Sequence, residues 1–288
     1  MNTGKIMNII GRILFVEVLL MLPSLFVSLI YRDGDTKAFV YTMIPAAIVS
    51  VLLMLVRQQQ KRMSSRDGYF IVAMAWIIIS IVGAFPLYLA GGFASYWGAL
   101  FEIVSGFTTT GASVLAEPGT LGHGVAFWRC FTHWVGGMGV LVFVLMLTNL
   151  DKKNSMYLMR AEVPGPEKDK LVPKTKTTAR ILYGIYFGLT LILVILLMFG
   201  GMNLFDSLIH AFGSAGTGGF SNYADSVGHF DSAYIDGVIT VFMILFGINF
   251  SAYFLLLSKK LRQAIHMEEV RWYLIIIFAS IVFISFNA

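Results

Sequence analysis

Charged side chains are scarce in this sequence. Asp, Glu, Lys and Arg make up 13% of its 288 residues, whereas a soluble domain normally carries charge at about a quarter of its positions. Hydrophobic residues make up 57% of the chain, and the mean hydropathy is +0.78. This composition leaves too few polar side chains to cover a water-exposed surface, so most of the surface is expected to face lipid.

Cysteine and the usual motifs of enzyme active sites are also missing or nearly so. Cys130 is the single cysteine, which excludes an intrachain disulfide framework and a cysteine-rich metal site. The HExxH, Walker A and GxGxxG motifs do not occur in the sequence. The few His, Asp and Glu residues are scattered over segments on opposite membrane faces. The sequence therefore predicts neither an enzyme nor a resident cofactor.

Long apolar runs, in contrast, are abundant. A helix needs roughly 20 apolar residues to cross the hydrocarbon core of a bilayer. The stretches that approach this length lie near residues 8–30, 38–56, 69–90, 124–149, 181–200, 237–257 and 271–286. The sequence therefore predicts an all-α membrane protein with about seven transmembrane helices.

The basic residues define an orientation in the membrane. Lys and Arg gather at the N-terminus and in residues 57–68, 150–180 and 258–271, whereas the opposite loops hold only Arg32 and Lys37. By the positive-inside rule the first group is cytoplasmic. The N-terminus is then inside the cell, and the loops at residues 91–123 and 201–236 face outward. Because the charges are spread over separate loops, no nucleic-acid partner is predicted.

One pattern occurs twice: a spanning helix, a short amphipathic segment, a Gly-rich loop and a second spanning helix. Laying Gly111 on Gly218 pairs Thr110 with Thr217. The predicted organisation is two leading helices (1–66), a first unit (67–150), a cytoplasmic loop (151–175), a second unit (176–257), and a basic loop with the first helix of an incomplete third unit (258–288).

The two short segments, residues 96–106 and 203–213, cannot cross a bilayer. As helices of about 11 residues they would reach roughly 16 Å, half of the membrane. Such a segment can enter the membrane and return if the irregular backbone after it is buried in protein or lines a watery cavity. We expect two re-entrant pore loops. Ordinary surface loops are the alternative, but they leave the repeated Thr-Gly pattern unexplained.

The composition of both loops suits the coordination of a cation by the main chain. Stacked carbonyl oxygens can replace the water shell of a monovalent cation without a fixed negative charge. Glycine permits the backbone angles required, and threonine adds a hydroxyl oxygen and a stiff side chain. The negative C-terminal ends of the two short helices also favour a cation. The predicted ion-binding residues are Thr108, Thr109, Thr110, Gly111, Ala112, Ala215, Gly216, Thr217, Gly218 and Gly219.

Five motifs together resemble the Trk/Ktr/HKT superfamily of potassium transporters, most closely its bacterial TrkH/TrkG branch. They are SRDG at 65–68, FTTTGAS at 107–113, HWVGGMG at 133–139, RAEVPGP at 160–166 and GTGGFS at 216–221. Each motif alone is weak, but their order and their placement relative to the helices are specific. The resemblance covers nearly the whole chain.

The resemblance implies four helix–pore loop–helix units around one pathway in the bacterial inner membrane. It also implies a homodimer with a cytoplasmic nucleotide-binding regulatory subunit of the TrkA type. One glycine in each loop of the superfamily is associated with potassium selectivity, and Gly111 and Gly218 occupy those positions here. Potassium would then lie at Thr109, Thr110, Gly111, Gly216, Thr217 and Gly218.

Only two of the four loops of the superfamily occur in this sequence. The predicted function is potassium transport as the pore-forming subunit, or as the N-terminal half of one. The alternative is a non-conducting structural subunit or inactive fragment that needs a second chain to complete the pore. Two copies of this chain would also supply four loops.

A few residues outside the loops carry predictions of their own. Residues 133–139, with three glycines, are expected to pack closely against neighbouring helices. Arg129 is expected to snorkel toward the membrane interface, and pairing with Glu102 or Glu117 is the alternative. Asn249 is expected to hydrogen-bond across helices and to hold the support of the filter. His210 is expected to be a packed residue rather than a ligand.

Overall fold

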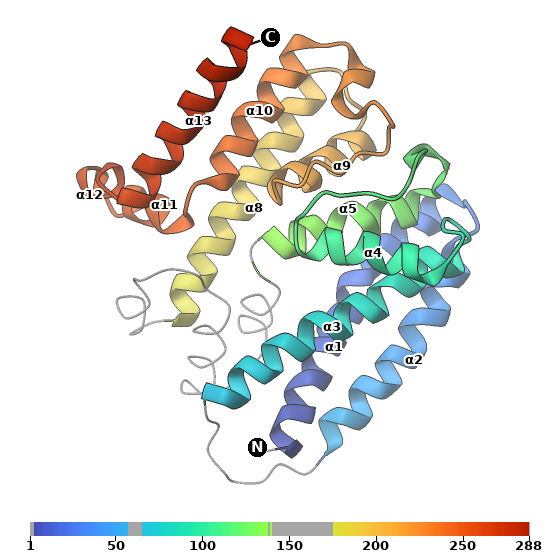
Figure 1. Ribbon diagram of the computed structural model, residues 1–288. Helices are drawn as coiled ribbons and strands as arrows, with labels where there is room; N and C mark the ends of the chain where they lie inside the picture. Colours follow the sequence, from blue (N-terminus) through green and yellow to red (C-terminus); the bar gives the residue numbers. More distant parts are fainter. Residues whose placement is uncertain (1–2, 57–64, 138, 140–174, 288) are drawn as a thin grey trace.

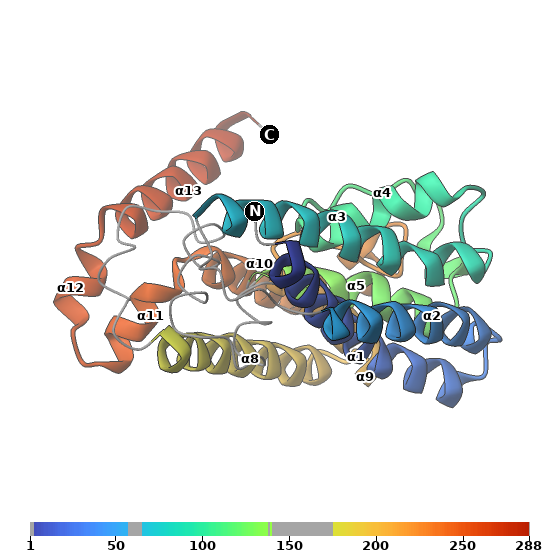
Figure 2. The ribbon, with the colours of Figure 1, turned by 90° about the horizontal axis from the view of Figure 1, so that it is seen from below.

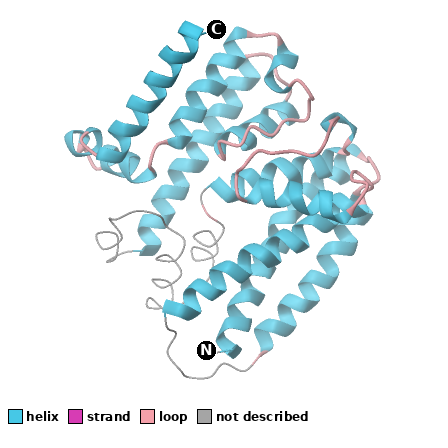
Figure 3. Ribbon diagram, in the orientation of Figure 1, coloured by secondary structure: helices cyan, strands magenta, loops and turns pink. Residues whose placement is uncertain are grey.

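The computed structural model describes residues 3–56, 65–137, 139 and 175–287, and within these residues the regular structure is entirely helical (Figure 3). The helices of the first part are α1 (Thr3–Tyr31), α2 (Thr36–Leu55), α3 (Ser65–Leu89), α4 (Tyr96–Phe107), the 3-10 helix η1 (Pro118–Thr120) and α5 (His123–Gly137). Those of the second part are α8 (Thr175–Phe199), α9 (Leu204–Ala215), the 3-10 helix η3 (Ser226–Phe230), α10 (Ala233–Gly247), α11 (Phe250–Leu257), α12 (Leu261–Ile265) and α13 (Glu268–Asn287).

The helices form two groups that meet at α5 and α9. Figure 1 shows α1 to α5 in one group and α8 to α13 in the other. One apolar core fills the first group around Ile13, Ile79 and Trp128, and a second core fills the other around Tyr186 and Leu197. Trp134 and Leu208 pack against both cores. The contact between the groups is therefore made by α5 and α9.

Five helices are long and apolar enough to cross a membrane: α1, α2, α3, α8 and α13. A sixth span results if α10 and α11 are taken together, although they are bent by 88° at the break between them. These account for six of the seven predicted stretches. The seventh, 124–149, begins as α5, but residues 140–149 lie outside the described residues. The all-helical membrane fold is confirmed, with five or six spans among the residues described.

The break between α10 and α11 is held by polar side chains. Oδ1 of Asn249 accepts a hydrogen bond from the backbone N–H of Ser251 at 2.8 Å and so caps the start of α11. Nδ2 of Asn249 donates to Glu269 of α13 at 2.7 Å. Asn249 therefore bonds across helices as predicted, but it ties the break to α13 and does not contact a pore loop.

Large apolar side chains point outward along the peripheral helices, as expected for a lipid-facing surface. α13 lies at the periphery in both views of the molecule (Figures 1 and 2). Its exposed residues include Trp272, Ile276, Phe278 and Phe283. Soluble monomeric proteins rarely expose such a run of large apolar residues, so the exposure is consistent with a bilayer around the helix.

The connection between α1 and α2 holds the start of α5 through two carboxylates. Oδ2 of Asp33 accepts hydrogen bonds from the backbone N–H of His123 at 2.7 Å and from its ring Nδ1 at 2.6 Å. Oδ2 of Asp35 accepts from the backbone N–H of Val125 at 3.0 Å. The first turn of a helix has N–H groups without partners, and here the connection between α1 and α2 supplies the acceptors for α5. The ring of His123 also stacks on Tyr31 with centroids 3.9 Å apart.

The Asp33–His123 contact predicts a pH-dependent stability. Burial raises the pKa of Asp33, but the hydrogen bonds from the His123 backbone and ring and the charge of that ring lower the pKa by more. The folded pKa therefore lies below the ordinary Asp value of about 3.9. A depressed pKa stabilises the folded state above the unfolded pKa, and the stabilisation is lost as the pH falls through the folded pKa. Asp33→Asn should lower the Tm in detergent at pH 7, and its difference from the parent should shrink below about pH 4.

The matched control for this measurement is Glu117→Gln, because Glu117 is an exposed carboxylate in the loop that leads into α5. This variant should keep the parental Tm at both pH values. The Tm difference between the parent and Asp33→Asn could instead stay constant from neutral pH to about pH 2. That result would show that the carboxylate charge does not contribute to the stability of the folded state.

Candidate ion-coordinating loops

Two half-length helices lead into the Thr-Gly loops. α4 and α9 have 12 residues each, which corresponds to roughly 18 Å and is too short to cross a bilayer. Each begins with a side-chain cap: Oγ of Ser95 accepts from the N–H of Gly98 at 3.2 Å, and Oδ1 of Asn203 accepts from the N–H of Asp206 at 2.9 Å. The two short segments predicted from the sequence are therefore helices, as expected.

The chain leaves both helices by the same turn. In the first loop, the N–H of Thr109 donates to the carbonyl of Gly106 at 3.0 Å, and the N–H of Thr110 donates to that of Ser105 at 2.9 Å. In the second loop, the matching donations are Thr217 to Ser214 at 2.9 Å and Gly218 to Gly213 at 3.1 Å. The polar groups at both helix ends are thus satisfied within the chain, which irregular backbone inside a membrane requires.

The left-handed residues of the two turns also correspond. Thr109 has φ 55° and Thr217 has φ 58°, while Gly111 has φ 78° and Gly219 has φ 79°. A β-branched residue with positive φ is a strained outlier. Such strain persists only where the surroundings enforce it, and it is frequent at functional sites. Both loops carry it at the same place.

This correspondence corrects the alignment derived from the sequence. Thr109 matches Thr217 and Gly111 matches Gly219, so the pairing of Gly111 with Gly218 is wrong by one residue. The sequence alignment followed the Thr-Gly dipeptide, which occurs at different places in the two turns. The structural register is set instead by the capped starts and the equal lengths of α4 and α9. The glycine equivalent to Gly111 is therefore Gly219.

The two loops lie against each other. A Cβ atom placed on Gly111 would overlap the carbonyl group of Gly218. Thr108, Thr110 and Ala112 of the first loop are exposed, as are Thr217 and Gly219 of the second. Thr109, Gly111 and Gly218 are half-buried, whereas Ala215 and Gly216 are buried behind the loop. The structure thus brings the two sets of predicted residues together, with Ala215 and Gly216 on the protein side.

α5 separates the ends of the two half-helices and packs on both. A Cβ on Gly136 would overlap the carbonyl of Phe107, the last residue of α4. A Cβ on Gly137 would lie 3.1 Å from the Cα of Gly216 and 3.2 Å from the carbonyl oxygen of Ala215. Close packing of the glycines in this segment was predicted, and at these two positions it is confirmed. Small residues permit such a backbone approach between helices in membranes.

Arg129 of α5 is buried and does not snorkel. Its side chain is 2% exposed, and Nε donates to Oε1 of Glu102 on α4 at 2.6 Å. The expectation of snorkelling is therefore wrong, and the alternative partner, Glu102, is the correct one. The physical reason is that Arg129 faces the interior between the loops, where each of its three nitrogen atoms finds an acceptor.

A serine in each loop is held by the half-helix before it. Oγ of Ser113 donates to Glu102 of α4 at 2.8 Å and accepts from the N–H of Leu115 at 3.1 Å. Oγ of Ser221 lies 3.0 Å from Nε2 of His210 on α9 and accepts from the N–H of Tyr223 at 3.0 Å. The two serines therefore play the same part in the two loops. The repeated Ser in FTTTGAS and GTGGFS was the signal that sequence reasoning did not use.

His210 connects α9 to the second loop through a defined tautomer. Its Nδ1 lies 2.8 Å from the carbonyl oxygen of Asp206. Because a carbonyl only accepts, Nδ1 carries the proton in the neutral ring and Nε2 accepts from the hydroxyl of Ser221. His210 is 3% exposed, which agrees with its interpretation as a packed residue.

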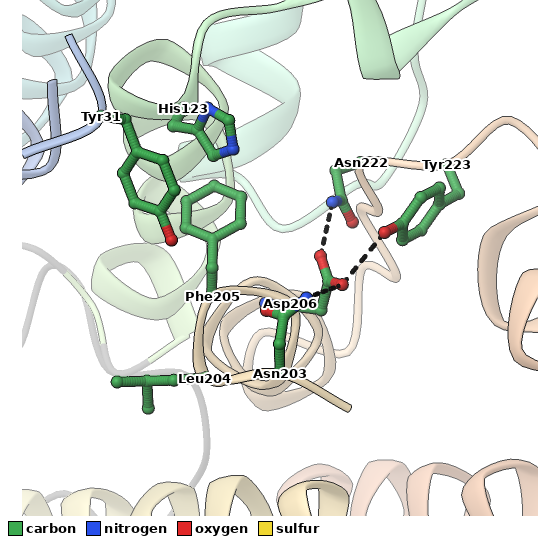
Figure 4. A pocket seen from close by; sticks show the side chains of 8 residues that line it. All are labelled: Tyr31, His123, Asn203, Leu204, Phe205, Asp206, Asn222 and Tyr223. Atoms are coloured by element: carbon green, nitrogen blue, oxygen red, sulfur yellow. Dashed lines mark hydrogen bonds between the residues drawn. The ribbon is translucent and has the colours of Figure 1, made fainter. Parts of the chain in front are cut away.

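A polar network anchors the outer part of the second loop at the start of α9. Figure 4 shows the carboxylate of Asp206 directed toward Asn222 and Tyr223. Oδ1 of Asp206 accepts from Nδ2 of Asn222 at 2.7 Å, and Oδ2 accepts from the hydroxyl of Tyr223 at 3.0 Å. These residues line a cavity of about 260 Å³ together with Tyr31, His123, Asn203, Leu204 and Phe205. The network fixes where the second loop returns to the surface.

The described residues contain no group of three or more His, Cys, Asp or Glu that could hold a metal ion. The hydroxyls of Thr108 and Thr110 are 2.8 Å apart at the exposed face of the first loop.

The sequence of residues 35–284 matches the protein family described as "TrkH: Cation transport protein". The chain belongs to the TrkH family. This family consists of transport proteins, which agrees with the prediction that the chain is not an enzyme. The resemblance to the superfamily inferred from the five motifs is thereby confirmed.

Several TrkH-family relatives cover nearly all of this chain. It is 38% identical over 264 residues to the Trk system potassium uptake protein TrkH of Salmonella typhimurium, covering 90% of this chain and 54% of the relative. It is 33% identical to TrkH of Halomonas elongata, covering 99% of this chain and 60% of the relative, and 31% identical to TrkG of Escherichia coli, covering 100% and 61%. The chain thus spans somewhat more than half the length of these curated relatives.

A solved structure has the same fold. The crystal structure of the potassium transporter TrkH from Vibrio parahaemolyticus matches with a TM-score of 0.77 and 30% sequence identity. The match covers 90% of this chain and 53% of the TrkH chain in the crystal. The chain is therefore a multi-pass membrane protein with the TrkH-family fold over most of its length.

The contact between α5 and the half-helices predicts a strong effect of Gly136→Ala. The added methyl group would overlap main chain rather than a movable side chain, so the free energy of unfolding should fall by about 3 kcal/mol, the upper part of the usual overpacking range. Gly184→Ala in α8 is the matched control, because a Cβ there meets nothing within 4 Å and alanine favours a helix. Thermal unfolding in detergent measures both, and equal Tm values for the two variants would contradict the packing.

Proposed function

We propose that this chain forms part of a potassium-conducting pathway whose selectivity filter includes the loops at residues 108–112 and 215–219. The observation that carries the proposal is the contact between two matching backbone turns at the ends of two half-length helices. Gly111 of the first turn lies against the carbonyl of Gly218 in the second. The names of the relatives, potassium uptake protein and potassium transporter, support potassium as the ion.

The chemistry of the loops supports passage of a partly dehydrated cation. The ends of α4 and α9 carry roughly half a negative charge each from the helix dipole, and both helices end at the loops. Main-chain and Thr hydroxyl oxygens would replace the water ligands of the ion. A neutral set of such ligands binds a monovalent cation weakly enough for it to leave again, which conduction requires.

The domain organisation predicted from the sequence becomes part of the same proposal. Residues 67–150 and 176–257 would be two copies of one helix–pore loop–helix unit, with 258–288 the start of a third. The matched turns, serines and half-helix lengths support the repeat. The two leading helices, 1–66, would lie outside the repeat and brace it.

We also propose the orientation and the partners that the family resemblance implies. The N-terminus would be cytoplasmic, in the inner membrane of a bacterium, because Lys and Arg gather on that side. Two chains would form a homodimer, and a cytoplasmic nucleotide-binding subunit of the TrkA type would regulate it.

The filter assignment predicts the effect of Gly111→Ser. The new side chain would overlap the Gly218 carbonyl and would sit at φ 78°, a conformation that serine rarely adopts. Potassium uptake by the complete assembly should therefore lose most of its preference over sodium. The measurement is the ratio of initial uptake rates for the two ions in proteoliposomes.

Gly91→Ser is the matched control for that experiment. Gly91 has a similar φ of 79°, but it lies in the connection between α3 and α4, and a Cβ there meets nothing within 4 Å. The control carries the same backbone strain without the contact between the loops, so it should keep the parental selectivity. An unchanged ratio in Gly111→Ser, or an equal loss in both variants, would contradict the filter assignment.

A second candidate is a structural subunit whose two loops, at residues 108–112 and 215–219, form a pore only together with the loops of another chain. Expression of this chain alone in a bacterium that lacks potassium uptake separates the two functions. Growth at low potassium is expected if the chain or its dimer conducts. Absence of growth, with the protein present in the membrane, would support the structural function.

A further inference from the structure

The position of the second loop depends on one face of α5. Arg129 and His133 are one helical turn apart on that face, and both contact Phe220, which follows Gly219. The guanidinium carbon of Arg129 lies 3.7 Å from the centroid of the Phe220 ring, and the ring centroids of His133 and Phe220 are 4.0 Å apart. Phe220 is 3% exposed, so these contacts are made inside the protein.

Arg129 connects the two loops directly. It donates from NH1 to the carbonyl oxygen of Ser221 in the second loop at 2.9 Å, and from NH2 to Oγ of Ser113 in the first at 3.3 Å. Its third bond is to Glu102, whose carboxylate compensates the positive charge of the guanidinium. Among the described residues it is the only buried Lys or Arg. The guanidinium carries five donors on three nitrogen atoms in a rigid planar fork, whereas the three donors of a lysine rotate about a single nitrogen atom.

His133 fills the space directly behind the second loop. A Cβ on Gly218 would overlap the His133 ring, and a Cβ on Gly216 would lie 2.7 Å from the carbonyl oxygen of His133. The loop therefore cannot move toward α5. Since Gly111 of the first loop lies against the Gly218 carbonyl, any shift of the second loop changes the spacing between the two loops.

The other supports of the second loop do not set that spacing. The carbonyl of Gly213 accepts from the N–H groups of Gly218 and Gly219 at 3.1 and 3.0 Å, and His210 holds Ser221. Gly213 and His210 both belong to α9, so these supports would move together with the second loop. The contacts from α5 are of another kind, because α5 is also packed on the end of α4 and on the first loop.

We propose that Arg129 and His133 are positioning residues that determine ion selectivity by fixing Phe220 and the second loop against the first. The proposal rests on the filter function proposed above. A cavity that discriminates between two monovalent cations depends on the spacing of its ligands. A loosened second loop should therefore reduce the discrimination between ions before it reduces the total transport.

The test uses Arg129→Lys and His133→Asn in the full chain, with Arg32→Lys as the matched control because Arg32 is exposed in the connection between α1 and α2. Arg129→Lys keeps the charge beside Glu102 but loses the bonds to both loops. Two quantities are measured: the potassium-to-sodium uptake ratio in proteoliposomes, and hydrogen exchange of the backbone amides in residues 108–112 and 216–221. We expect the ratio to fall about tenfold in both variants, which corresponds to about 1.4 kcal/mol between the two ions.

Hydrogen exchange separates this proposal from the proposed function. Exchange should accelerate in residues 216–221 in both variants and remain parental in the control. If the parent transports neither ion, the filter function fails for this chain alone, but faster exchange confined to the second loop still supports positioning. Unchanged exchange and an unchanged ratio overturn the proposal. Equal acceleration throughout α1 to α5 also overturns it, because Arg129 and His133 would then contribute only general stability.

Discussion

The need to satisfy main-chain polar groups in the middle of a membrane governs this structure. Irregular backbone at that depth is tolerated only where protein buries it or water reaches it. The two Thr-Gly loops meet the requirement by hydrogen bonds back to the last turns of α4 and α9. The geometry of those bonds holds a threonine in each loop at positive φ. Strain at these residues is thus enforced by hydrogen bonding.

α5 makes the two loops into one site. Its glycines let it approach the ends of both half-helices, and one to two turns earlier His133 and Arg129 reach the second loop and its Phe220. A buried ion pair such as Arg129–Glu102 is a poor source of stability, because desolvation of two charges offsets most of their attraction. The ion pair instead fixes the positions of the two loops, because the guanidinium and the carboxylate together bond to Ser113, Val114 and Ser221. Removal of either partner would leave a buried charge unpaired, which costs several kcal/mol.

The sequence was sufficient to predict the long helices, the half-length segments and the residues of the loops. The lengths of the apolar runs indicate the helices, and the Gly content indicates the loops. It was not sufficient for the register between the loops, since Thr-Gly occurs one residue earlier in the second turn than the backbone match requires. Arg129 was misjudged for a related reason. Snorkelling is the usual fate of an arginine near a helix end, and only the three-dimensional arrangement places Glu102 opposite it. The bend between α10 and α11 was also missed, because the apolar run 237–257 continues through it without proline.

The two loops use different chemistry at equivalent positions, and this difference follows from their shared arginine. Glu102 and His210 occupy the same place relative to their half-helices and hold Ser113 and Ser221 in the same way. A carboxylate at both places would leave one negative charge without a partner, because Arg129 can neutralise only one. Two arginines would place a net positive charge beside the proposed path for cations. One arginine, one carboxylate and one neutral imidazole give the same support to both loops with no net charge, so the potential at the proposed ion path would be left to the helix ends and the carbonyls.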